Sequence, residues 1–170
     1  MNESSQQNVF HLRFESVVPL PAPTVWQWVT SLEGIAAEMW PYFRMTAPKN
    51  VKSIADVTVV PGERLFRSRI YLFGFLPFGY DDMTLVEYRE GNGFVEESPM
   101  SSMKLWRHQR DIEATETGTR ITDQLTFEPR RAAKFVGWFM QRVFRHRHSV
   151  IERTLDGASK WSQKHAAADD

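Results

Sequence analysis

The chain has 170 residues, of which 42% are hydrophobic and 25% charged, and this composition is typical of one globular domain with a full core. Twenty-one basic side chains balance twenty-one acidic ones, so no global field attracts nucleic acid or an anionic membrane. Cysteine is absent, which excludes disulfides, thiolate metal sites and cysteine nucleophiles.

The N-terminal residues are polar and lack the basic-then-apolar order of a signal peptide. No apolar run approaches the roughly 20 residues that cross a bilayer. We therefore expect a cytoplasmic protein without stable membrane insertion. Residues 9–161 are predicted to form a single domain, and the polar ends, residues 1–8 and 162–170, are expected to fray.

The N-terminal part of the chain predicts one strand followed by two short helices. Apolar and polar residues alternate over Val9–Val18, which is typical of a half-buried strand. Three prolines end this strand, and the last of them, Pro23, suits the first turn of a helix. A second short helix is predicted over about Leu32–Met39 and ends near Pro41.

The middle of the chain, from about residue 51 to residue 127, has the pattern of strands and turns. Turns at Glu90–Gly93 and Glu116–Gly118 predict two hairpins, and consecutive hairpins predict an antiparallel meander. The predicted strands are Val57–Val60, Arg64–Phe73, Met83–Arg89, Phe94–Ser98, Met103–Thr115 and Thr119–Phe127.

The last predicted element is a helix over about Arg131–Trp161, which is long enough to cross a small domain. A sheet with one apolar face needs a cover, and no other predicted element is large enough. The element order therefore predicts an α+β fold in which a curved antiparallel sheet of about seven strands wraps around this helix. A helix across a curved sheet leaves a space where a small apolar molecule would bind.

Four segments add a family resemblance to this pattern. They are Val17–Trp26, Leu72–Gly79, Trp106–His108 together with Gly118–Asp123, and Phe144–His148. Their order and spacing resemble the SRPBCC superfamily, the START-like and Bet v 1-like helix-grip proteins, over about Val9 to Leu155. Within that superfamily the chain looks like the bacterial branch labelled polyketide cyclase/dehydrase or lipid-transport-like.

The resemblance implies a fold more firmly than a function. Members bind lipids, sterols, plant hormones or polyketides, and some are enzymes, so the fold does not fix the activity. It implies binding of a lipid, polyketide or aromatic-type molecule between sheet and helix, without a cofactor. A polyketide cyclase/dehydratase-like enzyme acting in the same cavity is the alternative. We expect a monomer or a weak homodimer.

Arg147 is the most informative residue of the C-terminal helix. On a helical wheel it falls near the centre of an apolar stripe formed by Val136, Met140, Val143, Val150, Ile151 and Ala158. A cation on a covered face needs a partner, because an isolated buried charge is costly. Asp123 is the expected partner, since it alternates with apolar residues on the inward face of its strand. An anionic or carbonyl-bearing head group of a ligand is the alternative partner of Arg147.

His108 is the best single candidate for a general acid or base, and it shares an inward strand face with Trp106 and Ile112. We expect Trp106 and His108 to line the cavity, with a plain core histidine as the alternative. If Glu116 pairs with Thr119, His108 lies about 13 Å along the sheet from Asp123. That register excludes a direct hydrogen bond between them. The adjacent carboxylates of Asp81–Asp82 and of Glu96–Glu97 point to opposite faces and form no catalytic pair.

The segment Phe73–Tyr80 is predicted as an aromatic loop between strands, and its glycines permit movement. It is interpreted as a rim over the cavity mouth. A loop packed into its own core, or a surface for a partner protein or a membrane, are the alternatives. The predicted ligand contacts are Trp106, His108, Arg147, Asp123, Phe75, Phe78, Met140 and Val143.

The basic run from Arg142 to His148 does not indicate a nucleic-acid site. The helical wheel scatters its members, acidic residues dilute them, and the net charge is zero. His146 and His148 do not share a helical face and so form no chelating pair. We expect no metal site, no nucleic-acid partner, and a small apolar molecule as the partner.

Overall fold

The computed structural model describes the backbone of residues 8–166 and the side chains of residues 8–158. In chain order the elements are β1 (Phe10–Val18), α1 (Ala22–Thr30), α2 (Leu32–Met39), β2 (Phe43–Met45), a 3-10 turn (Ile54–Asp56), β3 (Arg64–Leu72), β4 (Leu76–Arg89), β5 (Gly93–Glu96), β6 (Met103–Thr115), β7 (Gly118–Pro129) and α3 (Ala133–Ala166).

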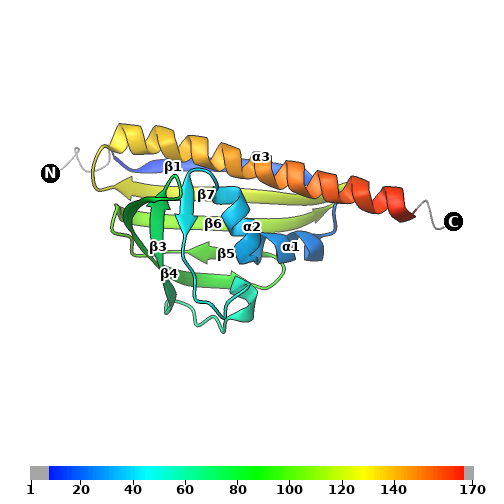
Figure 1. The fold of residues 1–170 in the computed structure, drawn as a ribbon, viewed down its shortest axis with the longest axis horizontal. Helices are drawn as coiled ribbons and strands as arrows, with labels where there is room; N and C mark the ends of the chain where they lie inside the picture. The colour runs from blue at the N-terminus through cyan, green and yellow to red at the C-terminus, as the bar shows by residue number, and fades with distance from the viewer. Residues whose placement is uncertain (1–7, 167–170) are drawn as a thin grey trace.

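The strands form one seven-stranded antiparallel sheet in the order β1-β7-β6-β5-β4-β3-β2. The sheet curls, so that β2 and β3 run in a different direction from β6 and β7 (Figure 1). Helix α3 runs beside β1 and β7, and α2 packs against it from the open side of the sheet. The predicted α+β architecture, with two short helices after the first strand and one long helix at the end, is confirmed.

The local patterns explain most of these elements. In β1 the outward residues are exposed and the inward residues are wholly or partly buried, as the alternation predicted. Helix α1 carries a proline in its first turn, and α2 begins where the Ser31 hydroxyl accepts the backbone N–H of Gly34 at 2.9 Å. Helix α3 continues beyond the predicted end at Trp161 to Ala166. Of the ends predicted to fray, residues 1–8 and 162–170, the parts 1–7 and 167–170 lie outside the described residues.

Two predictions about the strands were wrong. Val57–Val60 forms no strand, and the short strand β2 was missed because its three residues give no readable alternation. The segment Phe73–Tyr80 is not one loop, because β4 already begins at Leu76 and pairs there with Leu72. Only residues 73–75 form the turn, with Phe73 and Gly74 both at positive φ.

The apolar core consists of two clusters that lie side by side along α3. One contains Val18, Val25, Val29, Ile112, Ile121, Ile151 and Leu155 among others. The other contains Phe43, Trp106, Leu125, Phe127, Met140, Val143 and Phe144 among others. On β7 and α3, a charged residue separates the clusters. Asp123 lies between Ile121 and Leu125 on β7, and Arg147 lies between Phe144 and Ile151 on α3.

The predicted apolar stripe of α3 is only partly correct. Met140, Val143 and Ile151 are buried as expected, whereas Val150 is half-buried and Ala158 is exposed. The buried face instead includes three residues that the stripe omitted, namely Phe144, His148 and Leu155. Two consecutive polar residues of α3, Arg147 and His148, are also buried. The buried face of the helix is therefore wider than the stripe of apolar residues alone.

Candidate functional site

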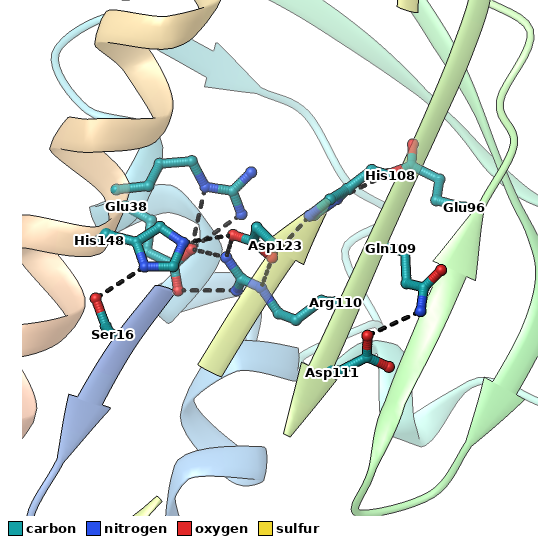
Figure 2. A network of polar contacts seen from close by, with 10 residues as sticks. Ser16, Glu38, Glu96, His108, Gln109, Arg110, Asp111, Asp123 and His148 are labelled. Atoms are coloured by element: carbon teal, nitrogen blue, oxygen red, sulfur yellow. Dashed lines mark hydrogen bonds and ion pairs between the residues drawn. The ribbon is translucent and has the colours of Figure 1, made fainter. Parts of the chain in front are cut away.

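A network of buried charges lies at the centre of the molecule (Figure 2). Its four main members come from four elements: Glu38 from α2, Arg110 from β6, Asp123 from β7 and Arg147 from α3. Glu38, Arg110 and Asp123 are fully buried, and Arg147 is almost so. Charges at this depth persist only when they are paired and hydrogen-bonded.

Arg110 connects the two carboxylates of this network. Its Nε and Nη2 donate to the two oxygens of Asp123, each at 2.7 Å, in a bidentate pair. Its Nη1 and Nη2 also donate to Glu38 at 3.3 and 3.1 Å. Burial alone would raise the pKa of Asp123, but the charges of Arg110 and His108 outweigh it and hold that pKa well below its usual range.

Arg147 was expected to pair with Asp123, and this prediction was wrong. Its Nε and Nη2 donate instead to Glu38 Oε2 at 3.1 and 2.9 Å. Glu38 reaches it because α2 packs against α3, and Glu38 lies four residues after the buried Gly34 on the inward face of α2. The signal in the sequence that identifies Glu38 is this i, i+4 spacing from Gly34, which places it on the inward face of the helix.

Two histidines complete the hydrogen bonding of Asp123. His108 Nε2 lies 2.9 Å from Oδ1, and His148 Nε2 lies 3.1 Å from Oδ2. Because Asp123 is ionised and can only accept, both nitrogens donate. The Nδ1 atom of His148 lies 2.8 Å from the hydroxyl of Ser16 on β1. His148 therefore links α3 to both β1 and β7.

The contact between His108 and Asp123 contradicts the predicted hairpin register. Thr115 pairs with Gly118, so that Glu116 and Thr117 form the turn and Arg110 lies opposite Asp123. Gly118 tolerates its positive φ and its close approach to the backbone of Val18, where a side chain would collide. A shift of the pairing by two residues brings His108 from its expected distance to a position diagonal to Asp123.

A cavity of about 100 Å³ adjoins this network, and residues of both core clusters line it. It is lined mostly by apolar side chains, which come from α1, α2, α3 and five of the strands. All six methionines of the described residues line it: Met39, Met45, Met83, Met100, Met103 and Met140. Methionine is flexible and polarizable, so such a wall adapts to irregular apolar shapes.

Polar groups gather at one part of this wall. Arg110, Arg147 and His108 reach the cavity from the network, and Glu96 of β5 and Asp81 of β4 reach it from the sheet. The sequence does not identify Asp81 and Glu96 as neighbours, because they lie on different strands and their contact depends on how those strands pair. The pairing of β4 with β5, and the Asp81–Met100 bridge beside it, bring the two inward carboxyl groups together.

The two carboxyl groups are in different states. Burial opposes ionisation of Glu96, but His108 and Ser98 outweigh it and lower the pKa of Glu96 below its usual value. The Ser98 hydroxyl donates to Glu96 at 2.7 Å, and His108 Nδ1 lies 3.6 Å away. Burial, reinforced by the charge of Glu96, raises the pKa of Asp81 to about 8. Asp81 therefore holds its proton at neutral pH.

A larger groove of about 630 Å³ lies outside the cavity, between the start of α3 and the turn that joins β3 to β4. It shares five wall residues with the cavity: Phe43, Phe78, Ser102, Met103 and Met140. Its outer edge includes the exposed Phe73 and Phe135, with Arg130 and Arg131 beside them. The groove is thus continuous with the cavity wall and provides an apolar approach to it.

The predicted ligand contacts fall into two groups. Trp106, His108, Arg147, Phe78 and Met140 line the cavity. Asp123 and Val143 lie behind its wall in the core, and Phe75 projects into solvent with 76% of its surface exposed. Within residues 8–158, no group of three or more His, Asp or Glu side chains is arranged to hold a metal ion. In the same part of the chain, no helix is long and apolar enough to cross a bilayer.

We predict that Asp123→Asn lowers the free energy of unfolding by about 3 kcal/mol at pH 7. The substitution removes the carboxylate that accepts hydrogen bonds from Arg110, His108 and His148, and it leaves the buried charge of Arg110 only partly compensated. The measurement is urea unfolding followed by tryptophan fluorescence. The matched control is Glu128→Gln on the same strand, whose partner Lys104 is half-exposed; its loss should stay below about 1 kcal/mol. Similar small losses in both variants would contradict a central role of Asp123.

We predict that Asp81→Asn raises the free energy of unfolding at pH 7. The folded state keeps Asp81 protonated to about pH 8, whereas the unfolded chain ionises it near its ordinary value of 3.8. Folding therefore loses stability as pH rises from about 4 to 8, by at most about 4 kcal/mol at pH 7. Asparagine removes this loss. Unfolding curves at pH 4.5 and 7.5 should show a gain that grows with pH; a destabilised variant at both values would contradict the prediction.

The architecture matches several solved structures. TTHA0849 from Thermus thermophilus aligns with a TM-score of 0.64 at 20% identity, over 88% of this chain and 99% of that one. A START superfamily protein from Mycobacterium smegmatis aligns with a TM-score of 0.59 at 12% identity, over 88% and 98%. CV1439 from Chromobacterium violaceum aligns with a TM-score of 0.60 at 12% identity, over 84% and 96%. These likenesses confirm the helix-grip fold of the START-like and Bet v 1-like proteins, and at these identities they show the fold alone.

The amino-acid sequence was also compared with curated proteins and with models of protein families. No curated protein matches the chain significantly. A family model described as "Domain of unknown function (DUF8410)" matches residues 16–155. The match runs from the inward serine of β1 to the last buried leucine of α3, and so includes the whole charged network and every cavity wall. The chain therefore belongs to the DUF8410 family.

Proposed function

We propose that this protein binds one small apolar or amphipathic molecule, of lipid, polyketide or aromatic type, in the cavity between the sheet, α2 and α3. The observation that carries the proposal is the wall itself: a mostly apolar space lined by six methionines, with a few polar groups gathered at one part. Concave, mostly apolar sites with few polar groups are the usual form of small-molecule sites.

The dimensions of the two spaces suggest how such a molecule lies. The cavity is small, at about 100 Å³, whereas the adjoining groove is about 630 Å³. One end of the molecule would enter the cavity while its apolar body follows the groove beside α3. Phe78 and Met140 line both spaces and would contact the molecule at their junction. The helix-grip fold supports binding of hydrophobic ligands in general, without naming one.

We predict that a molecule co-purifies with the natively isolated protein and appears in near-stoichiometric amount when the protein is denatured and the extract is analysed by mass spectrometry. Met140→Trp fills the junction of cavity and groove and should reduce recovery at least tenfold. Arg153→Trp places the same side chain on the exposed face of α3 and should leave recovery unchanged. Equal recovery from both variants would show that the molecule is held elsewhere.

Acid–base chemistry in the same cavity, of the cyclase or dehydratase type, is the second candidate. The observation that favours it is the His108 ring, which lines the cavity while Asp123 orients its Nε2 atom. The extraction experiment separates this candidate from simple binding. If the protein only binds the recovered molecule, the molecule keeps its mass after incubation with the protein. If the protein is a dehydratase, incubation with the hydrated precursor of that molecule yields a product lighter by one water.

The aromatic turn between β3 and β4 favours a contact with another protein as a further candidate. Phe73, Phe75 and Leu76 are 51%, 76% and 49% exposed, and such a cluster is unusual on a surface without a partner. We predict that Phe75→Ser leaves recovery of the bound molecule unchanged if the turn serves a partner, because Phe75 lines neither space. A severalfold loss in the extraction measurement would instead assign Phe75 to the rim of the groove.

A further inference from the structure

We propose that this protein docks reversibly on an anionic lipid bilayer through one face, which we call the docking face. It consists of the turn between β3 and β4 and the exposed side of the first half of α3, which lie beside each other (Figure 1). The docking goes beyond the proposed function and does not need it. Only one consequence rests on that function: the groove opens on this face, so a ligand would pass from the bilayer to the cavity without crossing water.

Most of the large apolar side chains that the described residues expose gather on the docking face. Phe73 and Phe135 line the groove together, and the Phe135 ring lies 5.9 Å from the ring of Trp138. Trp40 packs over the turn, where a side chain at Gly74 would collide with its ring. The exposed apolar members are Trp40, Phe73, Phe75, Leu76, Phe78, Phe135 and Trp138. A gathering of this kind marks an interaction surface.

The charges of the docking face have a single sign. Every charged residue between Arg130 and Ile151 is basic, and the segment Phe73–Tyr80 carries no charge, although the whole chain is formally neutral. Within residues 8–158, no acidic side chain pairs with the exposed cations of this face. These cations are Arg130, Arg131, Lys134, Arg142 and Arg145. The face is therefore locally positive and its charges are available to an anionic partner.

Helix α3 places aromatic and basic side chains alternately on its exposed side. Lys134, Trp138 and Arg142 follow one another at intervals of four residues and so share one stripe of the helix. Phe135 and Arg145 lie beside this stripe, and all five side chains are exposed. Helices that lie in the membrane interface combine tryptophan and phenylalanine with lysine and arginine in this way.

A hollow of about 290 Å³ beside the stripe offers a place for a lipid phosphate group. Arg142 and Arg145 line it from α3, and Tyr42 lines it from the segment between α2 and β2. The backbone carbonyl of Tyr42 accepts from the N–H of Phe73 at 2.9 Å, so the hollow adjoins the aromatic turn. Two guanidinium groups favour a phosphate over a neutral head group.

The single sign of the charges decides between a bilayer and a protein as the partner. A protein partner would have to place acidic groups at positions that match the scattered cations. An anionic bilayer presents phosphate groups over its whole surface and attracts basic side chains wherever they face it. Its apolar layer also accepts the aromatic turn, for which a protein would need matching pockets. The observations therefore favour the bilayer.

Sedimentation of the full chain with sucrose-loaded vesicles tests the docking. One kind of vesicle contains phosphatidylcholine alone, and the other contains about one third phosphatidylglycerol. We expect binding to the anionic vesicles to be at least tenfold tighter at about 0.1 M salt. This preference should largely disappear at about 0.5 M salt, because salt screens exposed charges. Equal binding to both vesicles at low salt would overturn the assignment of the basic residues.

Variants assign the binding to the docking face. Lys134→Gln combined with Arg142→Gln removes two cations of the stripe and should weaken binding to the anionic vesicles about tenfold. Lys52→Gln combined with Arg153→Gln is the matched control, since both residues are exposed and neither lines the groove or the hollow. The control should bind within twofold of the unaltered protein. Equal losses in both double variants would reduce the effect to net charge and contradict the docking face.

A fluorescent label tests the orientation on the bilayer. The chain has no cysteine, so Phe75→Cys can carry one environment-sensitive fluorophore. Its emission should shift to shorter wavelength when anionic vesicles are added, because the turn enters the interface. The same label on Val60→Cys, which precedes β3 at the end opposite the turn, should not respond. A response at position 60 alone would show that another face meets the bilayer.

The possible results separate the docking from the proposed function. If vesicles bind as expected and no molecule is extracted from the native protein, the docking stands and the proposed function fails. If a molecule is extracted and neither vesicle binds at about 1 mM lipid, the docking is wrong and the aromatic turn serves a protein. A dimer that forms without vesicles and that Phe75→Ser dissociates would assign the face to a second copy of the chain and overturn the inference.

Discussion

The pairing of Arg110 with Asp123 and Glu38 is the interaction on which the rest of the structure depends. One guanidinium joins a strand of the sheet to the neighbouring strand and to α2, and Glu38 extends the connection to Arg147 on α3. A buried network of this kind adds little net stability over an apolar core of the same shape, but removing any member leaves a charge without its partner. It therefore fixes which helix face meets which strand.

The same network determines where the protein core leaves space for a cavity. It divides the core into two apolar clusters, and one of them is completed by α1 while the other faces α2, β2 and the start of α3. Residues of both clusters line the cavity, and methionine and aromatic side chains of the second cluster form much of its wall. A rigid charged centre beside an adaptable apolar wall is a suitable arrangement for holding a molecule in one orientation.

The four buried acidic side chains of this region differ in their protonation and in their interactions. Glu38, Asp123 and Glu96 are held by cations or hydroxyl groups and serve the structure. Asp81 differs from them, because burial and the nearby charge of Glu96 raise its pKa to about 8, so that it holds its proton at neutral pH. A protein that keeps such a residue does so against its own stability, and residues of this kind concentrate at functional sites.

The sequence by itself determined the class of fold and most of its elements, because alternation, helical periodicity and turn residues act over a few neighbouring positions. It also placed Trp106, His108 and Arg147 at the cavity, since an inward strand face or an apolar helix stripe can be read locally. Tertiary structure decided the rest. The partner of Arg147, the contact of His108 with Asp123, and the meeting of Asp81 with Glu96 depend on strand register and helix packing, where a shift of two residues exchanges every neighbour.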